Sequence, residues 1–337
     1  MTDLSNLVSK NQLICFINND NMFEINSPKY VEFHLTDLCN SHCYFCNQVS
    51  LRTGNKSIDY QLFKRTLNNL KKQGLLAIRL SGGGEPTVYP KILEVVKYVQ
   101  QLNISLLRFD TNGINLSPEL CKKLLDCDLN ILHISLQAPS SQLWGDITQR
   151  DSKDFLRILG NIECFLKLDI YRLTKVYASF VVDEKTYECI PSMSKLCNDL
   201  GIGINVHYLN CHQYTGDFKN AVIPKVNKIL SNLQLRPDRE IPNFCGAPWM
   251  ALLIKANGDV YPCCALQDKL FIMGNILSSD IVDIWNGQKY QNFRLKFMGF
   301  NDNESMLITN PNFCDKKCPV NEGIMSVPID HYFIKGS

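Results

Sequence analysis

Short apolar segments rich in β-branched residues alternate with amphipathic helical stretches from residue 30 to about residue 210. We expect strands at residues 31–36, 77–80, 105–110, 131–136, 176–182 and 204–209. Strand–helix units in series require parallel strands joined by right-handed crossovers, and such sheets curl into a barrel or part of one. Residues 212–244 offer one helix and a proline-containing connector, too little for the two further units of an eight-fold barrel. The sequence therefore predicts an α/β fold with a partial six-stranded barrel.

Three cysteines, Cys39, Cys43 and Cys46, directly follow the first expected strand. The carboxyl ends of barrel strands carry the active site in such folds, so this loop lies at the catalytic face. Soft thiolates suit iron, and three of them on one loop can wrap an iron-sulfur cubane. A fourth cysteine is absent from the loop, which leaves an open coordination position typical of a site that does chemistry. The alternative is a closed zinc site, for which His42 or His34 would have to supply the fourth ligand.

The motif Cys39-Asn-Ser-His-Cys43-Tyr-Phe-Cys46 resembles that of the radical S-adenosylmethionine (SAM) superfamily. The resemblance implies that these cysteines hold a 4Fe-4S cluster and that the amino and carboxylate groups of SAM chelate its open iron. One electron from the reduced cluster would then cleave SAM to methionine and a 5'-deoxyadenosyl radical, which takes hydrogen from a substrate C–H bond. The protein's own work is to position the substrate and exclude water.

Three further strand ends resemble family positions that contact SAM. The glycine loop Ser81-Gly-Gly-Gly-Glu85-Pro86 follows the second strand, Asp110-Thr-Asn-Gly113 ends the third and Ser135-Leu-Gln137 ends the fourth. Tight turns and a hydrogen-bonded strand-end hydroxyl are the structural alternatives, for which glycine and Asn-Gly are the usual residues. The resemblance implies these cofactor-binding residues: Gly82, Gly83, Gly84, Glu85, Asn112 and Ser135.

Polar residues also alternate with apolar ones in the first strand, where Glu32, His34 and Thr36 follow Val31, Phe33 and Leu35 in turn. Because strand side chains alternate between faces, the polar set can line the barrel lumen while the apolar set faces the helices. Glu32 and His34 are therefore candidates for substrate contact. His207 and Cys211, near the end of the sixth strand, are similarly placed, although a lone histidine is more often a structural residue.

Fifteen cysteines in one chain indicate metal ligation or redox chemistry. After residue 245 the sequence resembles the SPASM and twitch auxiliary-cluster domains, through its cysteines and the stretches Met273-Gly-Asn-Ile276, Ile284-Trp285-Asn-Gly and Phe293-Arg294. The resemblance implies one auxiliary 4Fe-4S cluster, and a four-cysteine zinc knuckle is the alternative. Cys264 is either a buried residue without a role or a hydrogen donor to a substrate radical. The expected ligands of the auxiliary cluster are Cys245, Cys263, Cys314 and Cys318.

These assignments divide the 337 residues into an N-terminal extension at 1–27, a radical SAM core at 28–215, a helix and linker at 216–244, and an auxiliary-cluster domain at 245–337. The expected architecture is a partial (β/α)6 TIM-like barrel with a small C-terminal α+β iron-sulfur domain of the SPASM/twitch kind.

Charge and hydropathy exclude several classes of partner. The net charge is +2, and the Lys and Arg residues are scattered, so no nucleic-acid footprint is expected. No apolar run approaches the ~20 residues that span a bilayer, and the N-terminus does not resemble a secretion signal. We therefore expect a cytoplasmic enzyme without a membrane partner. The resemblance further implies an electron donor such as flavodoxin or ferredoxin.

Three functions remain open from the sequence. The first is a radical SAM enzyme, oxidoreductase-like, that oxidises, dehydrates or epimerises a small polar metabolite such as a sugar or aminocyclitol. The second is a peptide-modifying maturase, an epimerase or cross-linking enzyme. The third, from another class, is a non-enzymatic zinc or iron-sulfur binding protein. The roughly 30 residues before the cysteine loop are too few for a separate leader-binding domain, which slightly favours the small substrate.

Overall fold

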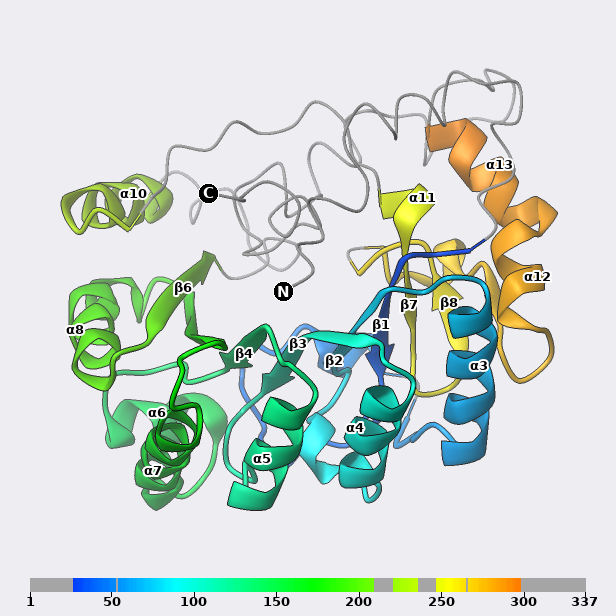
Figure 1. The fold of residues 1–337 in the computed structure, drawn as a ribbon. Helices are drawn as coiled ribbons and strands as arrows, with labels where there is room; N and C mark the ends of the chain where they lie inside the picture. Colours follow the sequence, from blue (N-terminus) through cyan, green and yellow to red (C-terminus); the bar gives the residue numbers. More distant parts are fainter. Residues whose placement is uncertain (1–26, 53, 209–220, 236–246, 265, 298–337) are drawn as a thin grey trace.

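The computed structural model describes residues 27–52, 54–208, 221–235, 247–264 and 266–297 (Figure 1). Its first six strands are parallel, and their order in the sheet is β6-β5-β4-β3-β2-β1. This arrangement confirms the expected partial barrel of strand–helix units. The six strands are β1 (Tyr30–His34), β2 (Ala77–Ser81), β3 (Ser105–Thr111), β4 (Ile131–Ile134), β5 (Lys175–Val182) and β6 (Gly203–Tyr208).

The C-terminal region extends the same sheet beyond β1, which the sequence did not predict. Strand β7 (Ala251–Ile254) pairs in parallel with β1, and Tyr30 lies opposite Ala251. Strands β8 (Asp259–Tyr261) and β9 (Gly274–Asn275) follow as antiparallel partners. The strand that leads into the cysteine loop is therefore hydrogen-bonded on one side to the barrel and on the other to the C-terminal region.

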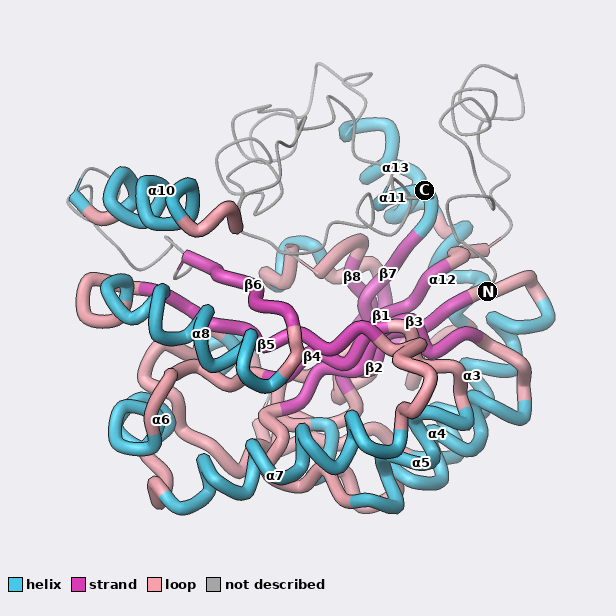
Figure 2. The backbone as a smooth tube through the Cα atoms, turned by 60° about the vertical axis from the view of Figure 1, so that its left-hand side comes forward, coloured by secondary structure: helices cyan, strands magenta, loops and turns pink. Residues whose placement is uncertain are grey.

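The helices α3, α4, α5 and α7 cover the outer side of the curved sheet (Figures 1 and 2). Their ends follow local signals in the sequence: Asp59 accepts a hydrogen bond from the backbone N of Leu62 at the start of α3, and Ser117 caps α5 by accepting from Leu120. No helix within the described ranges is long and apolar enough to cross a membrane. The helices are α2 (Gln48–Leu51), α3 (Tyr60–Lys72), α4 (Ile92–Gln101), α5 (Pro118–Asp126), α6 (Ser141–Thr148), α7 (Lys153–Leu168), α8 (Ile190–Leu200), α10 (Ile223–Asn232), α11 (Ala247–Met250), α12 (Ile281–Asn286) and α13 (Gln288–Phe297).

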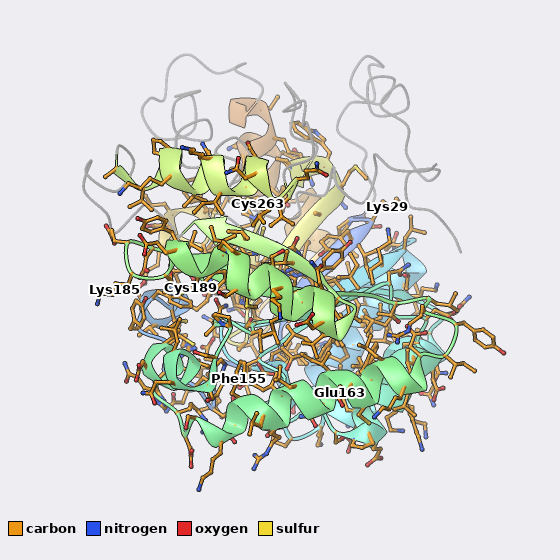
Figure 3. All side chains as sticks on the ribbon, turned by 90° about the vertical axis from the view of Figure 1, so that its left-hand side faces the viewer. Lys29, Phe155, Glu163, Lys185, Cys189 and Cys263 are labelled. Carbon is orange, nitrogen blue, oxygen red and sulfur yellow. The ribbon has the colours of Figure 1, made fainter. Side chains whose placement is uncertain are left out.

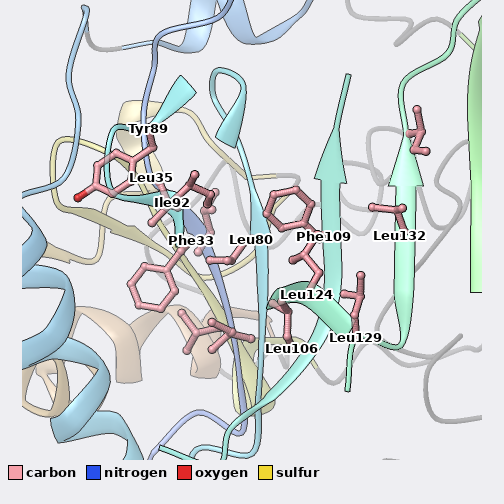
Figure 4. Packing of buried hydrophobic residues seen from close by; sticks show 14 of the residues in the cluster. Phe33, Leu35, Leu80, Tyr89, Ile92, Leu106, Phe109, Leu124, Leu129 and Leu132 are labelled. Carbon is pink, nitrogen blue, oxygen red and sulfur yellow. The ribbon is translucent and has the colours of Figure 1, made fainter. Parts of the chain in front are cut away.

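The core lies between the sheet and these helices, as Figure 4 shows for the first strands. Val31, Phe33 and Leu35 are fully buried on this face, where the ring of Phe33 packs edge-on against Phe63 of α3 with 5.0 Å between centroids. The intervening residues of β1 must point to the opposite, concave face because strand side chains alternate. The apolar pattern of the strand thus fixes which polar side chains line the lumen.

A second apolar cluster holds the C-terminal helices against the sheet. The rings of Trp285 and Tyr290 lie 4.8 Å apart, and the guanidinium of Arg294 stacks on both at 4.2 Å. Arg294 Nε also donates to the carbonyl of Pro248, just before β7. Helix α12 is tied to the barrel through Asp280, which accepts a hydrogen bond from Asn69 of α3. These contacts join the C-terminal region to the barrel's first strand–helix unit.

Candidate active site

The cysteine loop after β1 is anchored on both sides by backbone hydrogen bonds. The backbone N of Asp37 donates to the carbonyl of Lys56 over 2.8 Å. On the other side, His42 N donates to Thr148 O over 2.9 Å and Tyr44 N donates to Ile147 O over 3.2 Å, so the loop is hydrogen-bonded to the end of α6. Most of these partners are backbone groups, which no short sequence motif specifies. The loop is thereby held at the carboxyl edge of the sheet.

The thiols of this loop fit an iron-sulfur cluster better than a single metal ion. All three are half-buried, and burial, followed by the neighbouring thiols, raises the pKa of Cys43 to about 12. The pKa of Cys39 is also raised, with burial again the main cause. Within the described ranges, no three His, Cys, Asp or Glu side chains converge on one metal ion. Thiols that influence one another without converging suit a cluster, in which each cysteine binds a different iron and is deprotonated by it.

The glycine loop after β2 packs directly on the cysteine loop. Gly84 N donates to Thr36 O over 2.9 Å, and Glu85 N donates to Leu38 O over 2.8 Å. A Cβ placed on Gly84 would lie 1.9 Å from Leu38 O, and one on Gly83 would lie 2.6 Å from Asp37 Oδ1. Glycine is therefore required at Gly84 for the close approach of two backbones and at Gly83 for the close approach of the Asp37 side chain, and neither residue has a positive φ.

Glu85 is buried and fully engaged with the protein. Its Oε1 accepts from Thr87 Oγ1 at 2.7 Å and from Thr111 Oγ1 at 2.6 Å, and its Oε2 accepts from Asn112 N at 2.7 Å. Burial raises the pKa of this carboxyl, and the hydrogen bonds act in the opposite direction. Glu85 thus ties the glycine loop to the end of β3. It is a positioning residue, and its expected contact with SAM stays a prediction.

Asn112 and Ser135 occupy the ends of the next two strands. Asn112 Nδ2 donates to Asn40 Oδ1 at 2.6 Å and to Ser41 Oγ at 3.3 Å, so this side chain reaches into the cysteine loop. Ser135 is half-buried, and only its backbone N, which donates to Thr111 O over 2.8 Å, bonds to another residue of the described chain. The Ser135 hydroxyl is therefore available to a ligand, whereas the Asn112 side chain holds the cysteine loop in place.

Two cations beside the cysteine loop carried no recognisable signal in the sequence. Arg52 Nε donates to Gly83 O at 2.6 Å, and its charge lowers the pKa of Cys39 and Cys43 against the effect of burial. Lys255, only 3% exposed at the turn after β7, donates to Leu51 O at 2.8 Å. Both contacts join residues far apart in the chain, so spacing alone could not have revealed them.

The auxiliary-cluster cysteines are only partly within the described residues. Cys263 and Cys264 follow β8 directly and are half-buried, and Figure 3 marks Cys263. The carbonyl of Cys264 accepts a hydrogen bond from Gln267 Nε2 at 2.6 Å. The other expected ligands of the auxiliary cluster, Cys245, Cys314 and Cys318, lie outside the described ranges, as does Cys211 after the sixth strand. The assignment of these ligands, and of Cys264 as a hydrogen donor, stays a prediction.

Polar side chains from the first four strands form a connected network in the lumen. Arg79 donates to Glu32 Oε2 at 3.2 Å and to Asp110 Oδ2 at 2.7 Å, and Arg108 Nη2 donates to Asp110 Oδ1 at 2.6 Å. His133 closes the chain of contacts, with its Nδ1 2.9 Å from Arg108. The sequence anticipated Glu32 as a lumen residue but not that Arg79 would be its partner.

Fold and site together define an iron-sulfur enzyme built on a partial parallel barrel. A family model described as the radical SAM superfamily matches residues 33–197, and one described as an iron-sulfur cluster-binding domain, SPASM, matches residues 245–319. The chain belongs to the radical SAM superfamily and carries a SPASM domain. It is therefore an enzyme that uses SAM and 4Fe-4S clusters, one of them auxiliary, and is not a simple metal-binding protein.

Similar proteins cover both parts of the chain. The mycofactocin maturase MftC of Mycolicibacterium smegmatis is 26% identical over 75% of this chain and 69% of its own. A probable GTP 3',8-cyclase of Saccharolobus solfataricus is 24% identical over 83% of this chain and 94% of its own. Among solved structures, Streptococcus suis SuiB bound to its precursor peptide SuiA superposes with a TM-score of 0.64 at 18% identity, over 84% of this chain and 70% of SuiB. The last similarity shows the shared fold.

Proposed function

We propose that this chain is a maturase that abstracts hydrogen from a C–H bond of a peptide. The observation that carries the proposal is the match to a maturase relative across three quarters of the chain. Proteins of the same fold have also been solved with peptides bound, namely SuiB with SuiA and anSMEcpe with the peptide Cp18Cys.

We assign the cofactors to the residues named from the sequence. Cys39, Cys43 and Cys46 would hold the SAM-binding cluster, and the hydroxyl of Ser135 would bind SAM. When bound, the cluster and SAM supply the one-electron chemistry that removes hydrogen from an unactivated C–H bond. The residues expected to complete the two cofactor sites are Gly82, Gly83, Gly84, Glu85 and Asn112 for SAM, and Cys245, Cys263, Cys314 and Cys318 for the auxiliary cluster.

The chain's own contribution is to place these groups and keep water out. The hydrogen bonds of Glu85 and Asn112 join the ends of β2 and β3 and the cysteine loop into one unit. Arg52 supplies positive charge beside thiols that must ionise to bind iron. We further propose that the enzyme is cytoplasmic and receives electrons from a flavodoxin or ferredoxin.

A small polar metabolite, such as a sugar or aminocyclitol, is the second candidate substrate. The observation that supports it is the similarity to a probable GTP 3',8-cyclase over 83% of this chain, since the name of that relative indicates a small polar substrate. The substrate class is therefore the point that an experiment must decide.

Deuterium transfer distinguishes the two substrates. The organism that carries the chain is grown in deuterated medium, and its extract is given to anaerobically reconstituted, reduced enzyme with unlabelled SAM. Mass spectrometry then measures deuterium in the released 5'-deoxyadenosine. We expect transfer from the fraction above about 1 kDa, and its loss after digestion of that fraction with a broad-specificity protease.

Two outcomes would contradict the proposal. Transfer that survives protease and stays with molecules below about 500 Da assigns a small metabolite instead. A complete absence of 5'-deoxyadenosine from enzyme that holds about eight irons contradicts the cleavage of SAM itself. The matched control is the triple variant Cys39→Ala, Cys43→Ala and Cys46→Ala, which should keep about four irons and release no 5'-deoxyadenosine.

A further inference from the structure

Arg294 of α13 is buried and has one nitrogen without a partner. The residue is 4% exposed, and its guanidinium stacks on the rings of Trp285 and Tyr290 with 4.2 Å to each centroid. Nε donates to Pro248 O over 2.9 Å, and Nη1 donates to Trp285 O over 3.0 Å. Nη2 is buried and has no hydrogen-bond partner among the described residues. Because the guanidinium is planar and rigid, the two hydrogen bonds and the two rings also fix the position of Nη2.

The charge of Arg294 has no counter-charge within the described ranges. Burial lowers the pKa of Arg294 to about 10, so the guanidinium is still charged at neutral pH. Among the described residues only the Tyr290 phenol opposes this effect, and no carboxylate contributes to the pKa. Stacking on aromatic rings stabilises a cation, but it leaves Nη2 without an acceptor. Because a buried charge without compensation is costly, the arrangement calls for an anion that these residues do not supply.

Cys263, the one expected ligand of the auxiliary cluster that the structure describes, lies near the same aromatic pair. Tyr290 Oη donates to the carbonyl of Ala251, the first residue of β7, over 3.1 Å. Strand β8 runs antiparallel to β7, so the chain that leaves β8 toward Cys263 returns to this end of β7 (Figure 1). Burial raises the pKa of Tyr290, Arg294 lowers it, and Cys263 raises it further. Arg294 and Cys263 are therefore both within electrostatic reach of the Tyr290 side chain.

We infer that Arg294 is the counter-cation of the auxiliary cluster and that its Nη2 donates a hydrogen bond to one of the cluster's sulfurs. A cubane with four thiolate ligands is an anion, and its net charge and the hydrogen bonds to its sulfurs help to set its reduction potential. Reduction adds a further negative charge, so a fixed cation beside the cluster favours the reduced state. The inference depends on the auxiliary cluster and is independent of the class of substrate.

Pulsed EPR tests the hydrogen bond directly in the wild-type holoenzyme. The chain is produced with ¹⁵N only in its arginine side chains, and the auxiliary cluster is reduced under anaerobic conditions. Its EPR signal is identified as the one that persists in the triple variant Cys39→Ala, Cys43→Ala and Cys46→Ala. We expect a ¹⁵N hyperfine coupling on this signal. The variant Arg294→Lys has no labelled nitrogen at this position and should lose the coupling.

An EPR-monitored redox titration of the holoenzyme tests the effect of the charge. Arg294→Gln removes the positive charge, so the ratio of reduced to oxidised auxiliary cluster at a fixed potential should fall at least ~10-fold, which is about 59 mV for a one-electron couple. Arg294→Lys keeps a positive charge and should stay within ~3-fold of the wild type.

Tyr290→Phe is the matched control for loosening of the aromatic cluster. This variant loses the hydrogen bond to Ala251 O but keeps the ring on which Arg294 stacks. It should lower the thermal midpoint, because a buried hydrogen bond is lost, and change the ratio of reduced to oxidised cluster less than ~2-fold. A purely structural role of Arg294 would instead make the two variants alike in potential.

The inference is overturned by a labelled wild-type holoenzyme whose auxiliary signal shows no arginine ¹⁵N coupling, or by a coupling that persists in Arg294→Lys. It is also overturned if Arg294→Gln holds about eight irons and its ratio of reduced to oxidised cluster stays within ~2-fold of the wild type. If Arg294→Gln loses the auxiliary irons, the labelled wild-type protein still decides. All of these results are read without turnover, so failure of the deuterium-transfer experiment would contradict the proposed function and leave this inference unaffected.

Discussion

Asp110 is the residue on which the lumen network depends, and its replacement gives the sharpest stability prediction. Its carboxylate accepts from Arg79 Nε at 2.7 Å and from Arg108 Nη2 at 2.6 Å. The side chains of Arg79, Arg108 and Asp110 are only 15%, 4% and 16% exposed. In Asp110→Asn, Arg79 keeps its ion pair with Glu32, whereas Arg108 loses the carboxylate with which it pairs. Removing one partner of a buried ion pair costs about 3–5 kcal/mol, because the other charge stays buried without compensation.

We therefore expect Asp110→Asn to lower the free energy of unfolding by about 3–5 kcal/mol, measured from urea unfolding of anaerobic protein followed by circular dichroism. Asp199→Asn is the matched control, because its exposed pair with Lys195 should contribute less than about 0.5 kcal/mol. The double variant Asp110→Asn with Arg108→Gln restores the charge balance and should recover part of the loss. A loss below about 1 kcal/mol in the single variant would refute the view that these charges depend on one another.

Four further predictions follow from individual contacts. Folding lowers the pKa of His133 from 6.5 to about 4, so His133 takes up a proton more readily in the unfolded chain than in the folded one. The free energy of unfolding should therefore fall by about 2 kcal/mol between pH 7.5 and pH 5, as measured by urea unfolding at both pH values. Arg52→Gln should lower the reduction potential of the SAM-binding cluster by on the order of 50 mV in an EPR-monitored titration, because a nearby positive charge favours the reduced cluster; an unchanged potential would exclude this role. Gly84→Ala should prevent assembly of that cluster and leave about four irons per chain, because its Cβ would lie 1.9 Å from Leu38 O. The control Gly160→Ala has open space around its Cβ and should keep about eight irons per chain. If Cys264 donates hydrogen, Cys264→Ala should keep its iron and stop formation of an epimerised product, and loss of auxiliary iron would make it a ligand instead.

The six barrel strands could be predicted from the sequence because their signal is local. Each is a short β-branched run between helical stretches, and the observed ends differ from the expected ones by at most two residues. The expectation that cysteine and glycine loops meet rests on a similar rule, since consecutive parallel strands place their carboxyl ends side by side. Local pattern and topology were sufficient for both.

Strand β7 could not be predicted, because its partner is more than 200 residues away in the chain. The run Ala251–Ile254 is fully buried and reads equally well as part of a separate small domain. The same holds for Arg52 with Gly83 and for Lys255 with Leu51, which meet only after the sheet has formed. For Glu85 the motif predicts a role at the SAM site. It does not reveal that the carboxylate oxygens of Glu85 already accept hydrogen bonds from Thr87, Thr111 and Asn112.

The balanced charges of the lumen are also suited to radical chemistry. An unpaired arginine or carboxylate in the lumen would hold water, because a buried charge without a partner is costly unless it is solvated. Arg79 and Arg108 instead donate hydrogen bonds to Glu32 and Asp110, so the lumen network needs no water to neutralise its charges. A carbon-centred radical must be shielded from solvent and other quenchers until it meets the substrate. The pairing of the two arginines with the two carboxylates thus removes the electrostatic reason for water to occupy this part of the lumen.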